Sequence, residues 1–303
     1  MTYPLKRAAA IHDLSGFGRC SLTCIIPVLS AMSIQCVPIP TAVLSTHTGG
    51  FTDFEITDMT GHMRASLSHY KRLGLTFDAI YSGFLGSGEQ VGIVEDYISA
   101  FRGENTVALC DPVMGDDGAA YQTVTGEHRE SMKTLCAMAD VITPNVTEAF
   151  FLLDRPYAAA DEDAAAEMLY ELAEKYCKKV VITGIHGAAI DKPPECAVAD
   201  ADGSEKNQNA GEEFVTTASL DMTLSGARPV FCRKPAIKRG YPGTGDIFAS
   251  VLLGRLLKGK SLAAASEDAS SFVWDAMSVT ARTPSLSREG VMLESVLYEL
   301  IPR

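Results

Sequence analysis

The segment TVALCDPVMGDDG, residues 106–118, shows the pattern from which the fold can be predicted. A short apolar run ends at Asp111, and the Pro and Gly residues that follow it favour a turn. Similar runs recur along the chain, with helix-like stretches between them. This alternation predicts parallel βαβ units in a doubly wound α/β sheet. The six predicted strands are Ala8–Asp13, Cys36–Val43, Ala79–Gly83, Thr106–Asp111, Val141–Thr143 and Lys179–Thr183.

The other elements follow from the same reading of periodicity. Residues 199–213 are polar and rich in Gly and Asn, which predicts a solvated loop or hairpin tip. The Thr-rich stretch Phe214–Ile237 is strand-like. Because no repeat or linker divides the chain, we expect a single domain over residues 1–303. Helices are predicted near residues 20–33, 58–73, 88–101, 127–139, 161–177, 244–258, 261–280 and 287–301.

Charge and composition exclude several classes of protein. The formal net charge is −12 and no basic run relieves it, so a nucleic acid or an anionic membrane is not expected as a partner. The eight cysteines form no Cys-x-x-Cys pair, which disfavours a zinc ribbon or a redox dithiol and fits a reduced cytoplasm. The apolar run at the N-terminus is too short for a signal peptide, and no stretch of ~18 apolar residues predicts a membrane span.

Polar residues end several of the predicted strands. In a doubly wound sheet, ligands bind beyond the carboxyl ends of the strands. We therefore expect a functional site at that edge of the sheet. The strand-ending residues are Asp13, Asp111, Thr143 and Thr183.

The segment GYPGTGDIFAS, residues 240–250, carries the most chemical information. A Gly-x-Gly turn that opens an apolar helix directs free backbone amides at one point, where the helix dipole adds positive charge, and this suits a phosphate group. Asp246 lies in the first turn of that helix. It either favours the dipole or accepts the proton of an attacking hydroxyl group. A carboxylate of pKa ~4 is a weak base, but phosphoryl transfer demands little of the base until late.

Two further acidic segments predict a nucleotide and metal site. Asp111 and Asp116 follow a predicted strand and are suited to holding Mg²⁺ through water. The alternative is a turn formed by Asp, Pro and Gly, which accounts for the same residues without a function. Asn145 and Glu148 open the next helix. They are either nucleotide contacts or an N-cap and its capping-box partner.

Three other features of the sequence bear on function. His47 lies among hydroxyl and Gly residues, and the ring of Phe84 is suited to stacking on a flat heterocycle. A purely structural role is the alternative for each of them. The segment GRLLKGKS, residues 254–261, matches a phosphate-loop pattern, but it continues a helix instead of following a strand, so we reject it. Gly16 and Gly18 lack the third Gly of a dinucleotide-binding loop, which disfavours an oxidoreductase.

These segments resemble, in order and spacing, the pyridoxal/pyridoxine (vitamin B6) kinase branch of the ribokinase-like superfamily. The similarity extends from Ile11 to about Thr280. It implies a three-layer α/β/α sandwich with a central, mostly parallel sheet, a homodimer, use of ATP with Mg²⁺, and stimulation by a monovalent cation such as K⁺. The motifs that carry it are Thr46-His-Thr-Gly, Ser82-Gly-Phe-Leu-Gly-Ser, Asp111-Pro-Val-Met-Gly-Asp, Ile142-Thr-Pro-Asn with Glu148, and Gly243-Thr-Gly-Asp.

The resemblance also implies roles for individual residues. Asp246 matches the base that acts on the 5′-hydroxymethyl group of a B6 vitamer. Residues matching the anion hole are Gly243, Thr244 and Gly245, and those matching the ATP phosphates and Mg²⁺ are Asp111, Asp116, Thr143, Asn145, Glu148 and Thr183. Residues matching the substrate side are Asp13, His47, Thr48, Phe84 and Tyr121.

Some positions depart from that branch. Asp13 stands where a serine that touches the pyridine ring is common, residues 14–19 differ from the usual pattern, and Gly50 replaces a bulkier residue. A pyrimidine-type branch carries Cys in place of Asp246, so the Asp favours the plain base. The preferred vitamer therefore stays open. The alternatives are a hydroxymethylpyrimidine kinase of the same fold, a less favoured sugar kinase, and a non-catalytic ligand-binding protein.

Overall fold

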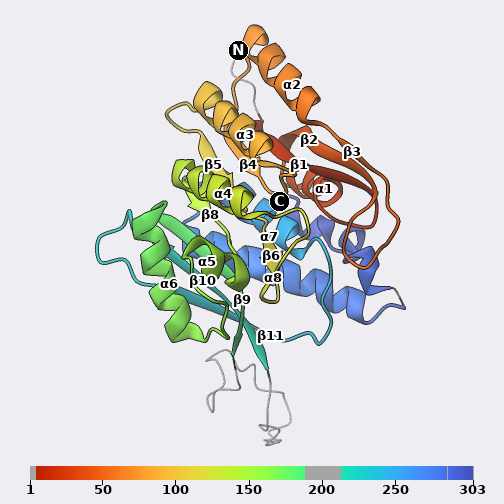
Figure 1. The fold of residues 1–303 in the computed structure, drawn as a ribbon. Helices are drawn as coiled ribbons and strands as arrows, with labels where there is room; N and C mark the ends of the chain where they lie inside the picture. The colour runs from red at the N-terminus through yellow and green to blue at the C-terminus, as the bar shows by residue number, and fades with distance from the viewer. Residues whose placement is uncertain (1–4, 188–212, 285, 303) are drawn as a thin grey trace, which may run out of the picture.

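The computed structural model describes residues 5–187, 213–284 and 286–302. In Figure 1 one twisted sheet runs through the molecule, with helices on both faces. Its nine strands lie in the order β11-β10-β9-β8-β5-β4-β1-β2-β3. The strands are β1 (Lys6–Phe17), β2 (Ile34–Thr46), β3 (Ile56–Asp58), β4 (Ala79–Ser82), β5 (Val107–Cys110), β8 (Val141–Ile142), β9 (Lys179–Gly187), β10 (Phe214–Asp221) and β11 (Val230–Pro235).

The centre of the sheet is parallel and its margins are antiparallel. β2, β1, β4, β5, β8 and β9 pair in parallel with their neighbours, while β3, β10 and β11 join as antiparallel strands. All carboxyl ends of the parallel strands therefore meet at one edge. A separate two-stranded sheet, β6 (Gly115–Asp116) with β7 (Ala119–Ala120), lies beyond the end of β5.

Helices cover the two faces of the sheet and enclose two apolar cores. In β1, Ala9 and Ile11 belong to one core while Ala8 and Ala10 belong to the other, as the alternation of a strand requires. Helices α2 to α6 pack on the first face, and α1, α7 and α8 on the second. The helices are α1 (Leu22–Ala31), α2 (Thr60–Leu73), α3 (Gly88–Phe101), α4 (Gly126–Met138), α5 (Val146–Leu152), α6 (Glu162–Lys175), α7 (Thr244–Leu257) and α8 (Leu262–Ala281).

Local sequence explains where several helices begin. The side chains of Ser87, Thr125 and Asp161 each accept a hydrogen bond from an amide in the first turn of α3, α4 and α6. Ser261 does the same for α8, while Gly254 lies inside α7. The rejected phosphate-loop pattern is thus the end of one helix and the cap of the next. No helix in the described ranges is long and apolar enough to cross a membrane.

The predicted three-layer α/β/α architecture with a mostly parallel sheet is confirmed. The strands β3, β6 and β7 were not predicted, and most of the predicted loop at 199–213 lies outside the described residues. The predicted helix at 287–301 is wrong. Gly290, with φ of 77°, interrupts it, and the segment forms three 3₁₀ helices: η1 (Ser287–Glu289), η2 (Leu293–Ser295) and η3 (Leu297–Leu300).

Candidate active site

The glycine turn before α7 is tightly packed. Gly243 is the N-cap of α7 and has φ of 80°, and a Cβ atom there would lie 2.3 Å from the carbonyl oxygen of Arg19. Only glycine fits both restrictions without strain. The first amides of a helix have no partner within the helix, so those of Thr244 and Gly245 are free to meet an anion. A Cβ atom on Gly245 would lie 4.0 Å from Oδ2 of Asp111, which places the turn beside the predicted acidic cluster.

Asp246 lies in the first turn of α7, and residues at the start of α1 contact its carboxylate. Its Oδ2 accepts a hydrogen bond of 2.8 Å from the amide of Ser21 and a longer contact of 3.6 Å from the thiol of Cys20. Its side chain is 11% exposed. Burial raises the pKa of Asp246 to about 7, with a further increase from the charge of Asp13. The carboxylate is thus a stronger base than the value of ~4 expected from sequence.

Ser21 also connects Asp246 to Asp13. Its hydroxyl donates a 2.5 Å hydrogen bond to Oδ1 of Asp13, and the hydroxyl of Ser15 donates to Oδ2 at 2.8 Å. Asp13 is buried, and this burial raises its pKa. Both oxygens of Asp13 therefore have partners within the protein. Its predicted contact with substrate stays a prediction.

Asp111 and Glu148 form the buried part of the acidic cluster. Thr143 donates a 3.0 Å hydrogen bond from its hydroxyl to Oδ1 of Asp111. Burial, and then the nearby charge of Asp246, raises the pKa of Asp111 to about 7. Burial and the charge of Asp111 raise the pKa of Glu148 well above its usual value.

Glu148 is a capping-box residue in this structure. Its side chain accepts hydrogen bonds from the amides of Asn145, at 2.9 Å, and Met114, at 3.0 Å. The side chain of Asn145 in turn accepts from the amide of Glu148, which completes the capping box of α5. The structural alternative for this pair is therefore realised. Its role toward a nucleotide or metal stays a prediction.

The remaining nucleotide-side residues lie near the same edge. Asn145 forms an isolated parallel bridge with Thr183 and donates from its side chain to the carbonyl of Gly115 at 2.8 Å. Asp116 is an exposed residue of β6. Within the described ranges, no three His, Cys, Asp or Glu residues could hold a metal ion by themselves. A Mg²⁺ ion here would need oxygen atoms from a nucleotide or from water as well.

On the substrate side, His47 faces the C-terminal segment. Its Nε2 lies 2.6 Å from the carbonyl oxygen of Arg288, and its Nδ1 accepts from the amide of Gly49 at 3.1 Å. This pairing corresponds to the tautomer protonated at Nε2. Because both nitrogens are used inside the protein, His47 has a structural role that does not depend on substrate. Thr48 is exposed, Phe84 is half-buried, and Tyr121 is 42% exposed.

Sequence reasoning missed three residues around Asp246. Ser21 and Cys20 contact its Oδ2, and Nδ1 of His12 lies 3.8 Å from its Oδ1. Ser21 has the unusual backbone φ of 51° for a residue other than glycine. A serine before an apolar run signals a helix N-cap, but nothing local signals contact with residue 246. His12 lies in an apolar run that predicts a strand and gives no sign of a contact with Asp246.

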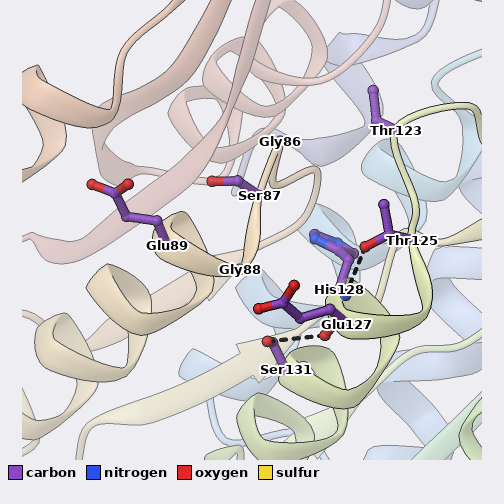
Figure 2. A pocket seen from close by; sticks show the side chains of 9 residues that line it. All are labelled: Gly86, Ser87, Gly88, Glu89, Thr123, Thr125, Glu127, His128 and Ser131. Carbon is purple, nitrogen blue, oxygen red and sulfur yellow. Dashed lines mark hydrogen bonds between the residues drawn. The ribbon is translucent and has the colours of Figure 1, made fainter.

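A polar pocket lies between the starts of α3 and α4, with a cavity volume of about 370 Å³. Figure 2 shows its lining side chains around His128. Two carboxylates and no Lys or Arg belong to this lining, so it is poorly suited to the phosphates of a nucleotide. Its residues are Gly86, Ser87, Gly88, Glu89, Thr123, Thr125, Glu127, His128 and Ser131.

The mostly parallel sheet and the glycine turn beside a largely buried carboxylate define a protein of the ribokinase-like superfamily. Residues 26–289 match the family model described as phosphomethylpyrimidine kinase, and the chain belongs to this family. The predicted resemblance to the pyridoxal kinase branch is confirmed by its relatives.

Three solved structures, of two proteins, are similar over nearly the whole chain. A Bacteroides thetaiotaomicron protein, provisionally named a phosphomethylpyrimidine kinase, is 38% identical with a TM-score of 0.87 over 99% of this chain and 95% of that one. A second crystal form of it, with pyridoxal, has a TM-score of 0.84 over 98% and 96%. Pyridoxal kinase from Lactobacillus plantarum is 28% identical with a TM-score of 0.82 over 98% and 96%.

Curated relatives match over a shorter length. A pyridoxal kinase from Histophilus somni is 30% identical over 210 residues, which cover 67% of this chain and 63% of that protein. The match thus spans less than two thirds of that relative.

Proposed function

We propose that this chain transfers the γ-phosphoryl group of ATP to the 5′-hydroxymethyl group of a B6 vitamer, with Asp246 as the base. One arrangement carries the proposal: the largely buried carboxylate of Asp246 lies in the first turn of α7, beside the free amides of that turn and beside Asp111. Burial raises the pKa of this carboxyl group to about 7, which suits a base. The pyridoxal in a crystal form of the Bacteroides relative and the name of the Lactobacillus enzyme support the choice of substrate.

In this reaction, the residues around Asp246 would have distinct roles. The amides of Gly243, Thr244 and Gly245 stabilise the charge that develops on the transferring phosphoryl group. Asp246 accepts the hydroxyl proton as the oxygen attacks phosphorus, and ADP leaves. Holding the two substrates in line supplies much of the rate.

A Mg²⁺ ion fits the chemistry of the neighbouring acidic side chains. Asp111 and Asp116 offer carboxylate oxygens, while those of Glu148 already accept backbone hydrogen bonds. We therefore expect Asp111 and Asp116 to hold the ion and Glu148 to support the loop at Met114. When bound, the ion neutralises charge on the phosphates.

The second candidate is a hydroxymethylpyrimidine kinase, and the description of the family model, phosphomethylpyrimidine kinase, is the observation that supports a pyrimidine substrate. It would use the same base and anion hole on a different ring. We propose in addition that the protein is a cytoplasmic homodimer formed from single-domain chains and that K⁺ stimulates it.

A side-by-side assay separates the candidates. Pyridoxal, pyridoxine, pyridoxamine and hydroxymethylpyrimidine are incubated with ATP and Mg²⁺, with and without K⁺, and ADP and the phosphorylated product are measured. The proposal predicts the highest kcat/KM with a B6 vitamer. A clear preference for hydroxymethylpyrimidine supports the second candidate. Absence of turnover with all four alcohols would support a non-catalytic ligand-binding protein instead.

A further inference from the structure

His12 is a fully buried residue of β1 with an unusual environment. The ring of Tyr81 meets it edge to face, with 4.3 Å between ring centroids. Gly83 leaves the space that the imidazole occupies, because a Cβ atom there would lie 2.3 Å from Nδ1 of His12. The surrounding chain is therefore shaped around this imidazole ring.

The ring has no hydrogen-bond partner at either nitrogen within the described part of the chain. A buried polar group without a partner destabilises the fold, and such groups in native structures call for an explanation. Burial also lowers the pKa of His12 to about 3, so the ring is neutral near pH 7. A neutral imidazole still offers one N–H donor.

The nearby acceptor for the N–H group of His12 is the carboxylate of Asp246. Nδ1 of His12 lies 3.8 Å from Oδ1 of Asp246, while Oδ2 of Asp246 already accepts from the amide of Ser21. The contact with His12 is longer than a hydrogen bond, but hydrogen bonds at active sites are often long before substrate binds and tighten afterwards. Other groups that interact electrostatically or by a hydrogen bond with Asp246 are Asp13, Cys20, Cys24, Tyr81 and Asp111.

We propose that His12 is a positioning residue, whose Nδ1–H donates to Oδ1 of Asp246 while the amide of Ser21 holds Oδ2. The inference rests on the proposed role of Asp246 as the base. Held at both oxygens, the carboxylate keeps one orientation toward the substrate hydroxyl group. Oδ1 retains a second lone pair for the incoming proton. Because His12 stays neutral throughout, it does not compete for that proton.

Three substitutions test the geometry. In His12→Asn the amide nitrogen takes the place of Nδ1, whereas in His12→Gln it reaches toward the place of Nε2, and His12→Leu removes the donor. We expect His12→Gln and His12→Leu to lower kcat by about 10- to 100-fold, with KM values for ATP and the alcohol changed by less than about threefold. His12→Asn should recover most of the lost kcat.

His128 provides the matched control. It too is buried and has no partner at either ring nitrogen among the described residues, but it lines the pocket between α3 and α4. His128→Leu should change thermal stability without lowering kcat. The inference is overturned if His12→Leu keeps normal kcat, or if His12→Asn and His12→Gln lose kcat equally.

A second measurement needs no change at His12. Nitrogen NMR of ¹⁵N-histidine-labelled protein should show His12 protonated at Nδ1, with a resonance that shifts in Asp246→Asn. Protonation at Nε2 would overturn the inference. If the wild-type protein phosphorylates none of the four alcohols, the proposed function fails. If the protein is active and His12 is protonated at Nε2, only the positioning role of His12 is contradicted, and the proposed function stands.

Discussion

The backbone amide of Ser21 lies 2.8 Å from Oδ2 of Asp246, which connects the start of α1 to the first turn of α7. The same residue donates from its hydroxyl to Asp13 and has a positive backbone φ of 51°, which is rare for a residue other than glycine. Strained residues of this kind cluster at functional sites. The proposed base is thus oriented by two helix starts from opposite ends of the chain.

The activity should depend on the protonation of Asp246. Since its pKa is raised to about 7 and a base must be deprotonated, kcat/KM should fall about tenfold for each pH unit below 7 and level off above about pH 8. Initial rates between pH 5.5 and 9 measure this limb. Using two vitamers controls for ionisation of the substrate. A flat profile over this range would contradict the raised pKa.

Gly243 should resist substitution more than another glycine of the same backbone conformation. Gly243→Ala places a Cβ atom 2.3 Å from the carbonyl oxygen of Arg19, whereas Gly259, with φ of 82°, has no heavy atom within 4 Å of that position. We expect Gly259→Ala to cost about 1 kcal/mol in free energy of unfolding. Gly243→Ala should cost about 3 kcal/mol or more and lower kcat. Urea unfolding measures both, and equal losses would refute the close packing.

Asp111 should destabilise the folded protein at alkaline pH. Its folded-state pKa, about 7, exceeds the ordinary value of 3.8, so the stability it contributes below pH 4 is lost as pH rises through 7. Without Mg²⁺, Asp111→Asn should therefore raise the free energy of unfolding at pH 8 by about 1–3 kcal/mol. At pH 4.5, where only a small part of this loss has occurred, the gain should be clearly smaller. Urea unfolding at both pH values checks this, and a variant that is less stable at pH 8 would refute it.

Those parts of the site whose geometry follows from a local sequence pattern could be predicted from the sequence. Strand-ending residues such as Asp111 and Thr143 gather because parallel strands share a carboxyl edge, and the glycine turn places Asp246 at a helix start. The carboxylate's proton affinity was not predictable, because burial arises only when the chain packs.

Long-range contacts account for what was missed. His12 and Ser21 meet a residue more than 200 positions away, which no local periodicity signals. His47 binds the carbonyl of Arg288 in a segment that we predicted to be helical. Because a helix was wrongly predicted there, the hydrogen bond between His47 and the carbonyl oxygen of Arg288 could not be predicted.

The turnover of Asp246→Asn decides whether Asp246 is the base. The variant keeps the size of the side chain but has no base, and its kcat for the preferred alcohol should fall by about 10²–10⁴-fold. Its Kd for ATP should stay within about threefold of the wild type. Near-normal kcat in this variant, with the fold intact, would show that Asp246 is not the base.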